Sequence, residues 1–393
     1  MRSVPAQRAP QAAGGAARSG GDSARGLGPT LLVIALAGLI LAGAPLAGAW
    51  LAGQPLAAYL EFPPRPVRVP APGFSWAAFW LLAALIIAAV APFAWRILRM
   101  PSAPRAPRER HSFPLWGWAA LLWLAASWTL AWTRFPWFEP FQGHTFTPLW
   151  LGYIAVVNAL TVRRKGSSLL TRQPWRFAAL FPLSALFWWF FEYLNRFVGN
   201  WYYAGTADFG ALEYTLFATL AFSTVLPAMA STAGWLRTFA PFDRTFGRWH
   251  PLRLSRPKLA AACVLVLTAA SLAGLGAFRD YLFPLVWISP ALLVVSLQAL
   301  AGRATVFAPL ACGDWRAIAT YPAAALACGF FWEMWNSGSL VHWEYSIAYV
   351  DRFRIFEMPL LGYAGYLPFG IQGAVIVALV LDPDRGPRQE DEG

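Results

Sequence analysis

The chain has 393 residues, of which 58% are hydrophobic and only 13% are charged. Soluble globular proteins carry about 25% charged residues, so this composition excludes a soluble enzyme and a soluble nucleic-acid-binding domain. The formal net charge of +12 does not indicate a nucleic-acid partner, because the basic residues lie in the loops between apolar segments, as membrane topology requires. These segments have roughly 20 residues each, the length that crosses the ~30 Å hydrocarbon core of a bilayer. We therefore predict an all-α polytopic membrane protein.

Ten segments are long and apolar enough to be predicted as transmembrane helices. In chain order they are 30–53, 75–98, 114–133, 147–162, 177–195, 211–236, 258–278, 281–301, 317–335 and 359–381. The segment 147–162 is short, and a re-entrant loop is the alternative for it.

Basic residues alternate between the two sides that this scheme defines. With the N-terminus in the cytoplasm, 24 of the 31 Lys and Arg residues lie in cytoplasmic segments and seven lie outside. Cytoplasmic loops carry the Lys and Arg excess in membrane proteins. We therefore expect a multi-pass protein of the inner (cytoplasmic) membrane with both termini in the cytoplasm.

The second half of the chain repeats features of the first half in the same order. The sequence FFEYLN at 190–195 corresponds to FWEMWN at 331–336, and WYY at 201–203 corresponds to WEY at 343–345. Six such features keep their order at separations of 136 to 144 residues. We predict two tandem repeats of three or four helices, and with four helices each they would be related by a pseudo-two-fold axis along the membrane normal.

This organisation divides the chain into six parts. They are a disordered cytoplasmic tail (1–28), two leading transmembrane helices with a basic loop (29–113), repeat 1 (114–236), a basic cytoplasmic linker (237–257), repeat 2 (258–381) and a polar C-terminal tail (382–393). A cleaved secretory signal is the alternative for residues 1–49, because Ala47-Gly48-Ala49 follows an apolar run.

Four of the 19 acidic residues lie at or just inside the ends of predicted helices, and they form two equivalent pairs: Glu192 and Glu213, and Glu333 and Glu357. Helix-end anchoring explains Glu213 and Glu357 if they open helices, where a carboxylate suits the dipole. It fails for Glu192 and Glu333, which close helices. Their aromatic neighbours favour the protonated form, and an acid at membrane depth is costly unless it has a function.

These residues resemble the lycopene cyclase domain of the integral-membrane type, in the tandem form that fuses two units. The family's motif is an acid beside aromatics, a Trp/Tyr loop and a Pro-Leu-Glu-Glu sequence that opens the next helix. Here the first copy reads FFEYLNRFVGNWYY then GALEYTLF, and the second reads FFWEMWNSGSLVHWEY then RIFEMPLLGY. The likeness covers about 145–381, but Glu213-Tyr214 and Glu357-Met358 replace the Glu-Glu doublet.

The resemblance implies a cofactor-free isomerase that acts on an isoprenoid lipid in the bilayer. Glu192 or Glu333 would protonate a terminal double bond, and Glu213 and Glu357 would stabilise the cation or remove a proton. Asn195 and Asn336 would orient the acids. The resemblance also implies that six aromatic residues form the walls of the site: Trp188, Trp201, Tyr203, Trp332, Trp343 and Tyr345.

No metal site is expected. Cys263, Cys312 and Cys328 lack metal-like spacing, and of the two repeats only the second places a histidine, His342, in its Trp/Tyr loop. Two other function classes remain open: a proton-coupled transporter of a lipid or small molecule, which fits the repeats and the acids, and a non-catalytic membrane scaffold.

The orientation yields the first testable prediction. A cysteine introduced at Thr206, in the first Trp/Tyr loop, should react with an impermeant thiol reagent in intact cells, because the flanking loops carry the basic excess. The native cysteines are replaced by serine beforehand, and Arg172→Cys in a basic loop serves as the matched control that should react only after lysis. The opposite labelling pattern would reverse the predicted orientation.

Overall fold

The computed structural model describes residues 19–100 and 111–381, and these are mostly helical. The α-helices are α1 (Ser19–Leu51), α2 (Ala57–Leu60), α3 (Trp76–Leu98), α4 (Leu115–Trp132), α5 (Phe146–Lys165), α6 (Leu169–Arg172), α7 (Pro174–Val198), α8 (Ala211–Phe222), α9 (Val225–Leu236), α10 (Pro257–Gly274), α11 (Arg279–Leu282), α12 (Ser289–Leu300), α13 (Arg316–Gly338) and α14 (Tyr366–Leu381).

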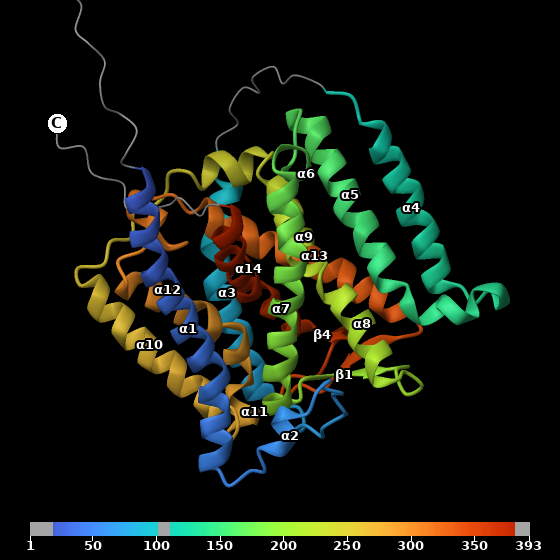
Figure 1. Cartoon of the computed structure of the whole chain (residues 1–393), viewed down its shortest axis with the longest axis horizontal. Helices are drawn as coiled ribbons and strands as arrows, with labels where there is room; N and C mark the ends of the chain where they lie inside the picture. Colours follow the sequence, from blue (N-terminus) through green and yellow to red (C-terminus); the bar gives the residue numbers. More distant parts are fainter. Residues whose placement is uncertain (1–18, 101–110, 382–393) are drawn as a thin grey trace, which may run out of the picture.

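Shorter elements connect these helices (Figure 1). The 3-10 helices are η1 (Pro136–His144), η3 (Phe283–Trp287), η4 (Ala308–Cys312) and η5 (Leu360–Gly365), and η2 (Pro241–Thr245) is a single π-helical turn. The strands are β1 (Trp201–Ala204), β2 (His342–Tyr345), β3 (Arg354–Ile355) and β4 (Met358–Pro359). Helix α1 begins at Ser19, earlier than the predicted tail boundary, whereas residues 1–18 and 382–393 lie outside the described residues.

Seven helical spans among the described residues are long and apolar enough to cross a membrane, or up to nine if each of two bent pairs is one span. The bent pairs are η1 with α5, at 73°, and the segment Arg279–Trp287 with α12, at 55°. These data support a multi-pass helical membrane protein, but they do not confirm ten spans.

Helix α13, which was predicted as a span at 317–335, is continuous but is not among the apolar spans. The reason lies in its packing, because α13 contacts α4, α9 and α14 and so has little surface left for lipid. Thr320, Glu333 and Asn336 are buried on this helix and lower its apolar content.

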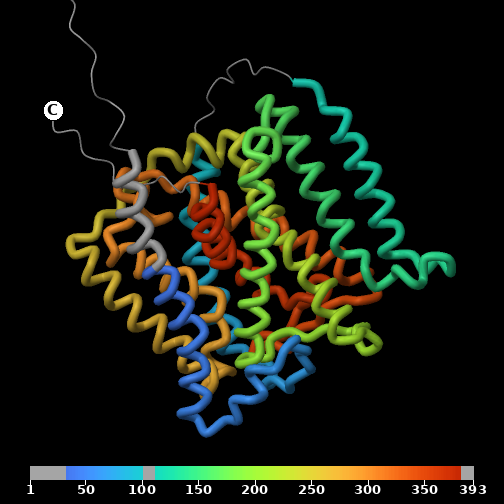
Figure 2. Tube along the Cα trace, viewed as in Figure 1, coloured from blue at the N-terminus to red at the C-terminus, as the bar shows by residue number. Residues whose placement is uncertain are grey.

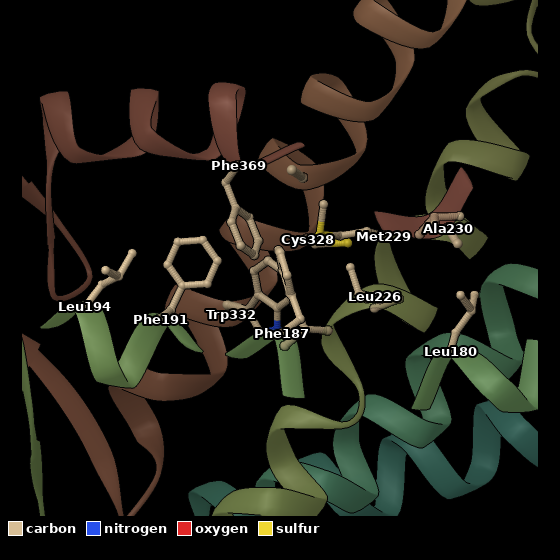
Figure 3. Close-up of a cluster of buried hydrophobic side chains, with 14 of the residues drawn as sticks. Leu180, Phe187, Phe191, Leu194, Leu226, Met229, Ala230, Cys328, Trp332 and Phe369 are labelled. Carbon is tan, nitrogen blue, oxygen red and sulfur yellow. The ribbon is translucent and has the colours of Figure 1, made fainter. Parts of the chain in front are cut away.

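A central group of helices is formed by α7, α9, α13 and α14, which contact one another (Figure 2). Figure 3 shows Phe187 and Phe191 of α7 gathered with Trp332 of α13 and Phe369 of α14. The ring centroids of Phe187 and Phe191 lie 5.6 and 5.5 Å from that of Phe369. The outer helices α3 and α10 instead carry exposed large apolar side chains such as Ile87 and Leu267, as lipid contact requires.

One small sheet joins segments that are far apart in the sequence. Strands β1 and β2 pair antiparallel, with Trp201 opposite Tyr345, Tyr202 opposite Glu344 and Tyr203 opposite Trp343. Each strand follows a long helix that contains a proline, Pro182 in α7 and Pro322 in α13. The pairing therefore fixes the ends of α7 and α13 next to each other. We call this end of the helical bundle the strand end.

Candidate active site

Glu192 is held by three hydrogen bonds to a single carboxyl oxygen. Its Oε1 accepts from Tyr203 Oη at 2.6 Å, from Trp201 Nε1 at 3.0 Å and from Trp188 Nε1 at 3.0 Å. The side chain is fully buried, and Oε2 has no hydrogen-bond partner among the described residues. We call Glu192, Trp188, Trp201 and Tyr203 the Glu192 cluster.

Glu333 is held in a similar way by two phenols. Its Oε1 accepts from Tyr345 Oη at 2.6 Å and from Tyr366 Oη at 2.7 Å, and Trp343 Nε1 donates to Tyr345 Oη at 2.8 Å. Glu333 is also fully buried, and within the described part of the chain its Oε2 lacks a partner. We call Glu333, Trp343, Tyr345 and Tyr366 the Glu333 cluster.

Neither carboxyl group forms an ion pair within the part of the chain that the structure describes. Among residues 19–100 and 111–381, no lysine, arginine or histidine nitrogen lies within 4.0 Å of an oxygen of Glu192 or Glu333. A buried carboxylate without a paired charge is very costly. A neutral, proton-bearing carboxyl group avoids this cost, and hydrogen bonds from hydroxyl and indole groups reduce it for a charged one.

The tyrosines of the two strands keep their protons. Burial raises the pKa of the Tyr203 phenol well above its usual range, and the neighbouring Glu192 acts in the same direction. Burial and Glu333 likewise raise the pKa of the Tyr345 phenol. Both hydroxyls are therefore available as hydrogen-bond donors at neutral pH.

The β1–β2 ladder presents these side chains on one face. Successive side chains of a strand point to opposite faces, so Trp201 and Tyr203 share a face with their cross-strand partners Tyr345 and Trp343. The other face carries Tyr202, whose Oη donates to Glu344 Oε2 at 2.5 Å. The ladder thus brings the two clusters onto the same side of one small sheet.

The two asparagines hold the strands and do not contact the acids directly. Asn195 Nδ2 donates to the carbonyl of Trp201 at 2.8 Å, and its Oδ1 accepts from the backbone N–H of Asn200 at 2.8 Å. Asn336 exchanges the same kind of bonds with the backbone of Trp343, at 2.7 and 2.8 Å. Each asparagine therefore fixes the start of the strand that carries the donors to the glutamate.

Glu213 and Glu357 lie apart from these clusters. Glu213 is in the first turn of α8, as expected, and its Oε1 lies 3.6 Å from His144 Nε2. The expectation that Glu357 opens a helix is wrong, because this residue lies in the turn between β3 and β4. Its Oε2 is 3.6 Å from Arg354 Nη1. The chain reverses at this turn before it can form η5 and α14.

A cavity of about 830 Å³ lies beside both clusters. All six aromatic residues predicted as site walls line it, namely Trp188, Trp201, Tyr203, Trp332, Trp343 and Tyr345. The glutamates and asparagines themselves do not line it. The tyrosine hydroxyls therefore stand between the buried carboxyl groups and the cavity.

Helix α3 forms a long wall of this cavity. Its lining residues recur every three or four positions, which places them on one helix face: Leu82, Leu85, Ile86, Ala89, Val90, Phe93, Ala94 and Ile97. This helix meets the rest of the protein through Phe79, whose ring contacts Phe353, and through the lining residue Phe93, whose ring contacts Phe246. At a rise of 1.5 Å per residue, the lined stretch is about 22 Å long.

Tyr366 was missed in the sequence because its counterpart in the first half is different. At the separation of 144 residues, Tyr366 corresponds to Phe222, and at 141 residues Gly329 corresponds to Trp188. A Cβ atom on Gly329 would lie 2.4 Å from the Tyr366 ring. Gly329 thus leaves room for the Tyr366 ring at the position where the first half has the Trp188 indole. The donor to Glu192 therefore comes from the same helix, whereas the donor to Glu333 comes from α14.

The comparisons with known proteins provide no further guide. No family model matches the chain, and neither a curated protein nor a solved structure is significantly similar to it. Among the described residues, no group of three or more His, Cys, Asp or Glu side chains could hold a metal ion. The functional argument therefore depends on the geometry of the two clusters and the cavity.

The close approach of Gly329 and Tyr366 generates the second prediction. Gly329→Ala should push the Tyr366 ring away and weaken its bond to Glu333, and Tyr366→Phe should remove the same bond. Because the two changes share one interaction, the double variant should lose clearly less stability than the sum of the single losses. The measurement is the midpoint of thermal unfolding in detergent.

Gly234→Ala in α9 is the matched control, since a Cβ there has no atom within 4 Å. It should leave the midpoint unchanged or raise it slightly. Strict additivity of Gly329→Ala and Tyr366→Phe would contradict the coupling.

Proposed function

We propose that this protein is a membrane-embedded isoprenoid cyclase or isomerase that protonates a double bond and closes a ring through a carbocation. The observation that supports this most is the pair of buried, unpaired carboxyl groups, each connected by a tyrosine hydroxyl to one shared apolar cavity. The substrate would be a membrane lipid, and no cofactor is part of the proposal.

The shape of the cavity favours a long hydrocarbon substrate. Its wall along α3 is apolar over about 22 Å, and the clusters lie near the strand end of that wall. A linear isoprenoid could lie along α3 with its terminal double bond beside the tyrosines. The cavity volume of about 830 Å³ lies within the range of roughly 300–1,000 Å³ that is typical of pockets for small molecules and cofactors.

The surroundings suit cation chemistry. Trp188, Trp201, Trp332 and Trp343 present ring faces and edges around the cavity, and the π face of an aromatic ring attracts a cation. An apolar site also keeps water away from a reactive intermediate. A carboxyl group that is neutral because it is buried can serve as the acid.

The tandem repeat is part of this proposal. At a separation of 142 residues, Trp201 corresponds to Trp343 and Tyr203 corresponds to Tyr345. Across the β1–β2 ladder each residue is paired with the counterpart of the other, so Trp201 lies opposite Tyr345 and Tyr203 lies opposite Trp343. Tyr202 and Glu344, which also correspond, face each other. A pseudo-two-fold axis through that central pair would relate the two clusters, as expected for two repeats of the same orientation.

The membrane placement is proposed on the same basis. The strand end would face the outside of the inner membrane, with both termini in the cytoplasm, because the basic residues gather in the opposite loops. A lipid substrate could then reach the cavity from the bilayer without crossing water.

The third prediction tests the acids. In cells that accumulate linear isoprenoids such as squalene, phytoene or lycopene, the wild-type protein should produce a new cyclic isomer. Glu192→Gln and Glu333→Gln cannot donate a strong acid's proton, and at least one should lower conversion by about 10²–10⁴-fold. The product is measured by liquid chromatography and mass spectrometry, normalised to protein in the membrane.

Glu344→Gln is the matched control, because Glu344 lies on the same ladder but binds Tyr202 away from the clusters. It should retain wild-type conversion. Normal conversion in both single variants and in the double variant would end the proposal, as would a wild-type protein without a new lipid product. Proton-coupled uptake that Glu192→Gln or Glu333→Gln abolishes, with no new lipid, would identify a transporter instead.

A further inference from the structure

We infer that the two clusters have different roles: Tyr345 and Tyr366 deliver a proton from Glu333 to the substrate, and Tyr203 returns a proton to Glu192. This inference rests on the proposed function and assigns the proton-transfer groups within it. It differs from direct protonation by a glutamate, because the tyrosines, and not the carboxyl groups, line the cavity.

The first argument is access. Glu192 and Glu333 are fully buried and absent from the cavity wall, whereas Tyr203, Tyr345 and Tyr366 line it. Each of these phenols is bonded to a glutamate Oε1 at 2.6 or 2.7 Å. A substrate in the cavity therefore meets a hydroxyl with a carboxyl group directly behind it.

The second argument is the kind of donor in each cluster. A hydroxyl group donates and accepts, so it can pass a proton on, whereas an indole N–H only donates. The two hydrogen bonds to Glu333 Oε1 come from hydroxyls, and those bonds can reverse, whereas the nearby Trp343 indole donates to Tyr345 Oη. Two of the three partners of Glu192 are the indoles of Trp188 and Trp201. Fixed donors stabilise the anionic form, so Glu192 is suited to be the proton acceptor.

The third argument is proximity. Tyr203 and Tyr345 occupy the same face of the β1–β2 ladder as diagonal neighbours, with Tyr203 opposite Trp343 and Trp201 opposite Tyr345. Diagonal neighbours in an antiparallel pair are about 7–8 Å apart. A single isoprenoid terminus can thus contact both clusters. Glu213 and Glu357, which contact His144 and Arg354, do not line the cavity and are not needed as bases.

The proton steps balance. Glu333 gives its proton to a tyrosine as that tyrosine gives its own to a terminal alkene carbon, which leaves a tertiary cation and a carboxylate. The electrons of a second double bond form the ring bond and move the cation into the ring. A neighbouring C–H bond then breaks to form a new double bond, and its proton passes through Tyr203 to Glu192, which starts the cycle as a carboxylate held by its three donors. Proton exchange with water resets both carboxyl groups, and the net reaction is an isomerisation.

The test uses the full-length protein in liposomes in D₂O, supplied with the linear isoprenoid that the wild type converts. In Glu333→Gln and in the Tyr345→Phe/Tyr366→Phe double variant, the substrate should be recovered unchanged and without deuterium, at least about 10²-fold below wild-type turnover. In Glu192→Gln, the substrate should be consumed into abnormal products that carry deuterium, an alcohol or an alkene formed by loss of another proton. Mass spectrometry distinguishes these patterns.

Tyr202→Phe is the matched control, because this tyrosine is on the same strand but bonds to Glu344 outside the clusters. It should form the normal labelled product. The phenylalanine variants retain the rings, and their thermal midpoints in detergent are measured to exclude unfolding as the cause. If Glu333→Gln fails to fold, Tyr345→Phe and Tyr366→Phe carry the test alone.

Two results would overturn the inference and leave the proposed function intact. One is the reversed pattern, with abnormal labelled products from Glu333→Gln and unchanged substrate from Glu192→Gln. The other is wild-type conversion in the Tyr345→Phe/Tyr366→Phe variant, which would mean that no tyrosine passes the proton. A wild-type protein that converts none of the isoprenoids would overturn both the inference and the function.

Discussion

Two carboxyl groups buried without counter-ions are the constraint on which the centre of this protein depends. Each buried carboxyl oxygen needs hydrogen bonds from neutral donors, and residues close in the sequence, such as Trp188 for Glu192, supply only some of these bonds. The remaining donors come from Tyr366 of α14 and from β1 and β2, the two strands that Asn195 and Asn336 hold in place. The small sheet therefore supplies hydrogen-bond donors to the two glutamates within a bundle that is otherwise packed through apolar and aromatic side chains.

The two clusters solve the same problem with different residues. On α7 the helix itself provides the Trp188 indole, which packs against Phe222 at 6.1 Å. On α13 the corresponding position is Gly329, and the Tyr366 ring of α14 occupies the space. The exchange keeps the volume filled, but it replaces a fixed donor by a hydroxyl that can also accept. This difference in packing between the two halves also changes the chemistry of the site.

Helix α3 shows how the leading part of the chain contributes. It contacts the body of the protein near both ends, where Phe79 meets Phe353 and Phe93 meets Phe246, and it leaves an apolar face toward the cavity in between. Arg96 strengthens the end away from the strands by donating to the carbonyls of Thr245 and Arg248.

The amino-acid sequence by itself determined the membrane class, most helix positions and the two segments that combine a glutamate with aromatic residues, because apolar length and local spacing are written along the chain. Only the tertiary structure decided that Glu357 lies in a turn, that the asparagines hold strands, and that Tyr366 bonds to Glu333. The pairing of β1 with β2, and the arrangement of α3 and α14 around them, depend on contacts between residues more than 30 positions apart, in some cases more than 100. Periodicity and composition describe neighbours along the chain, so they cannot specify which distant side chain will meet a buried carboxyl group.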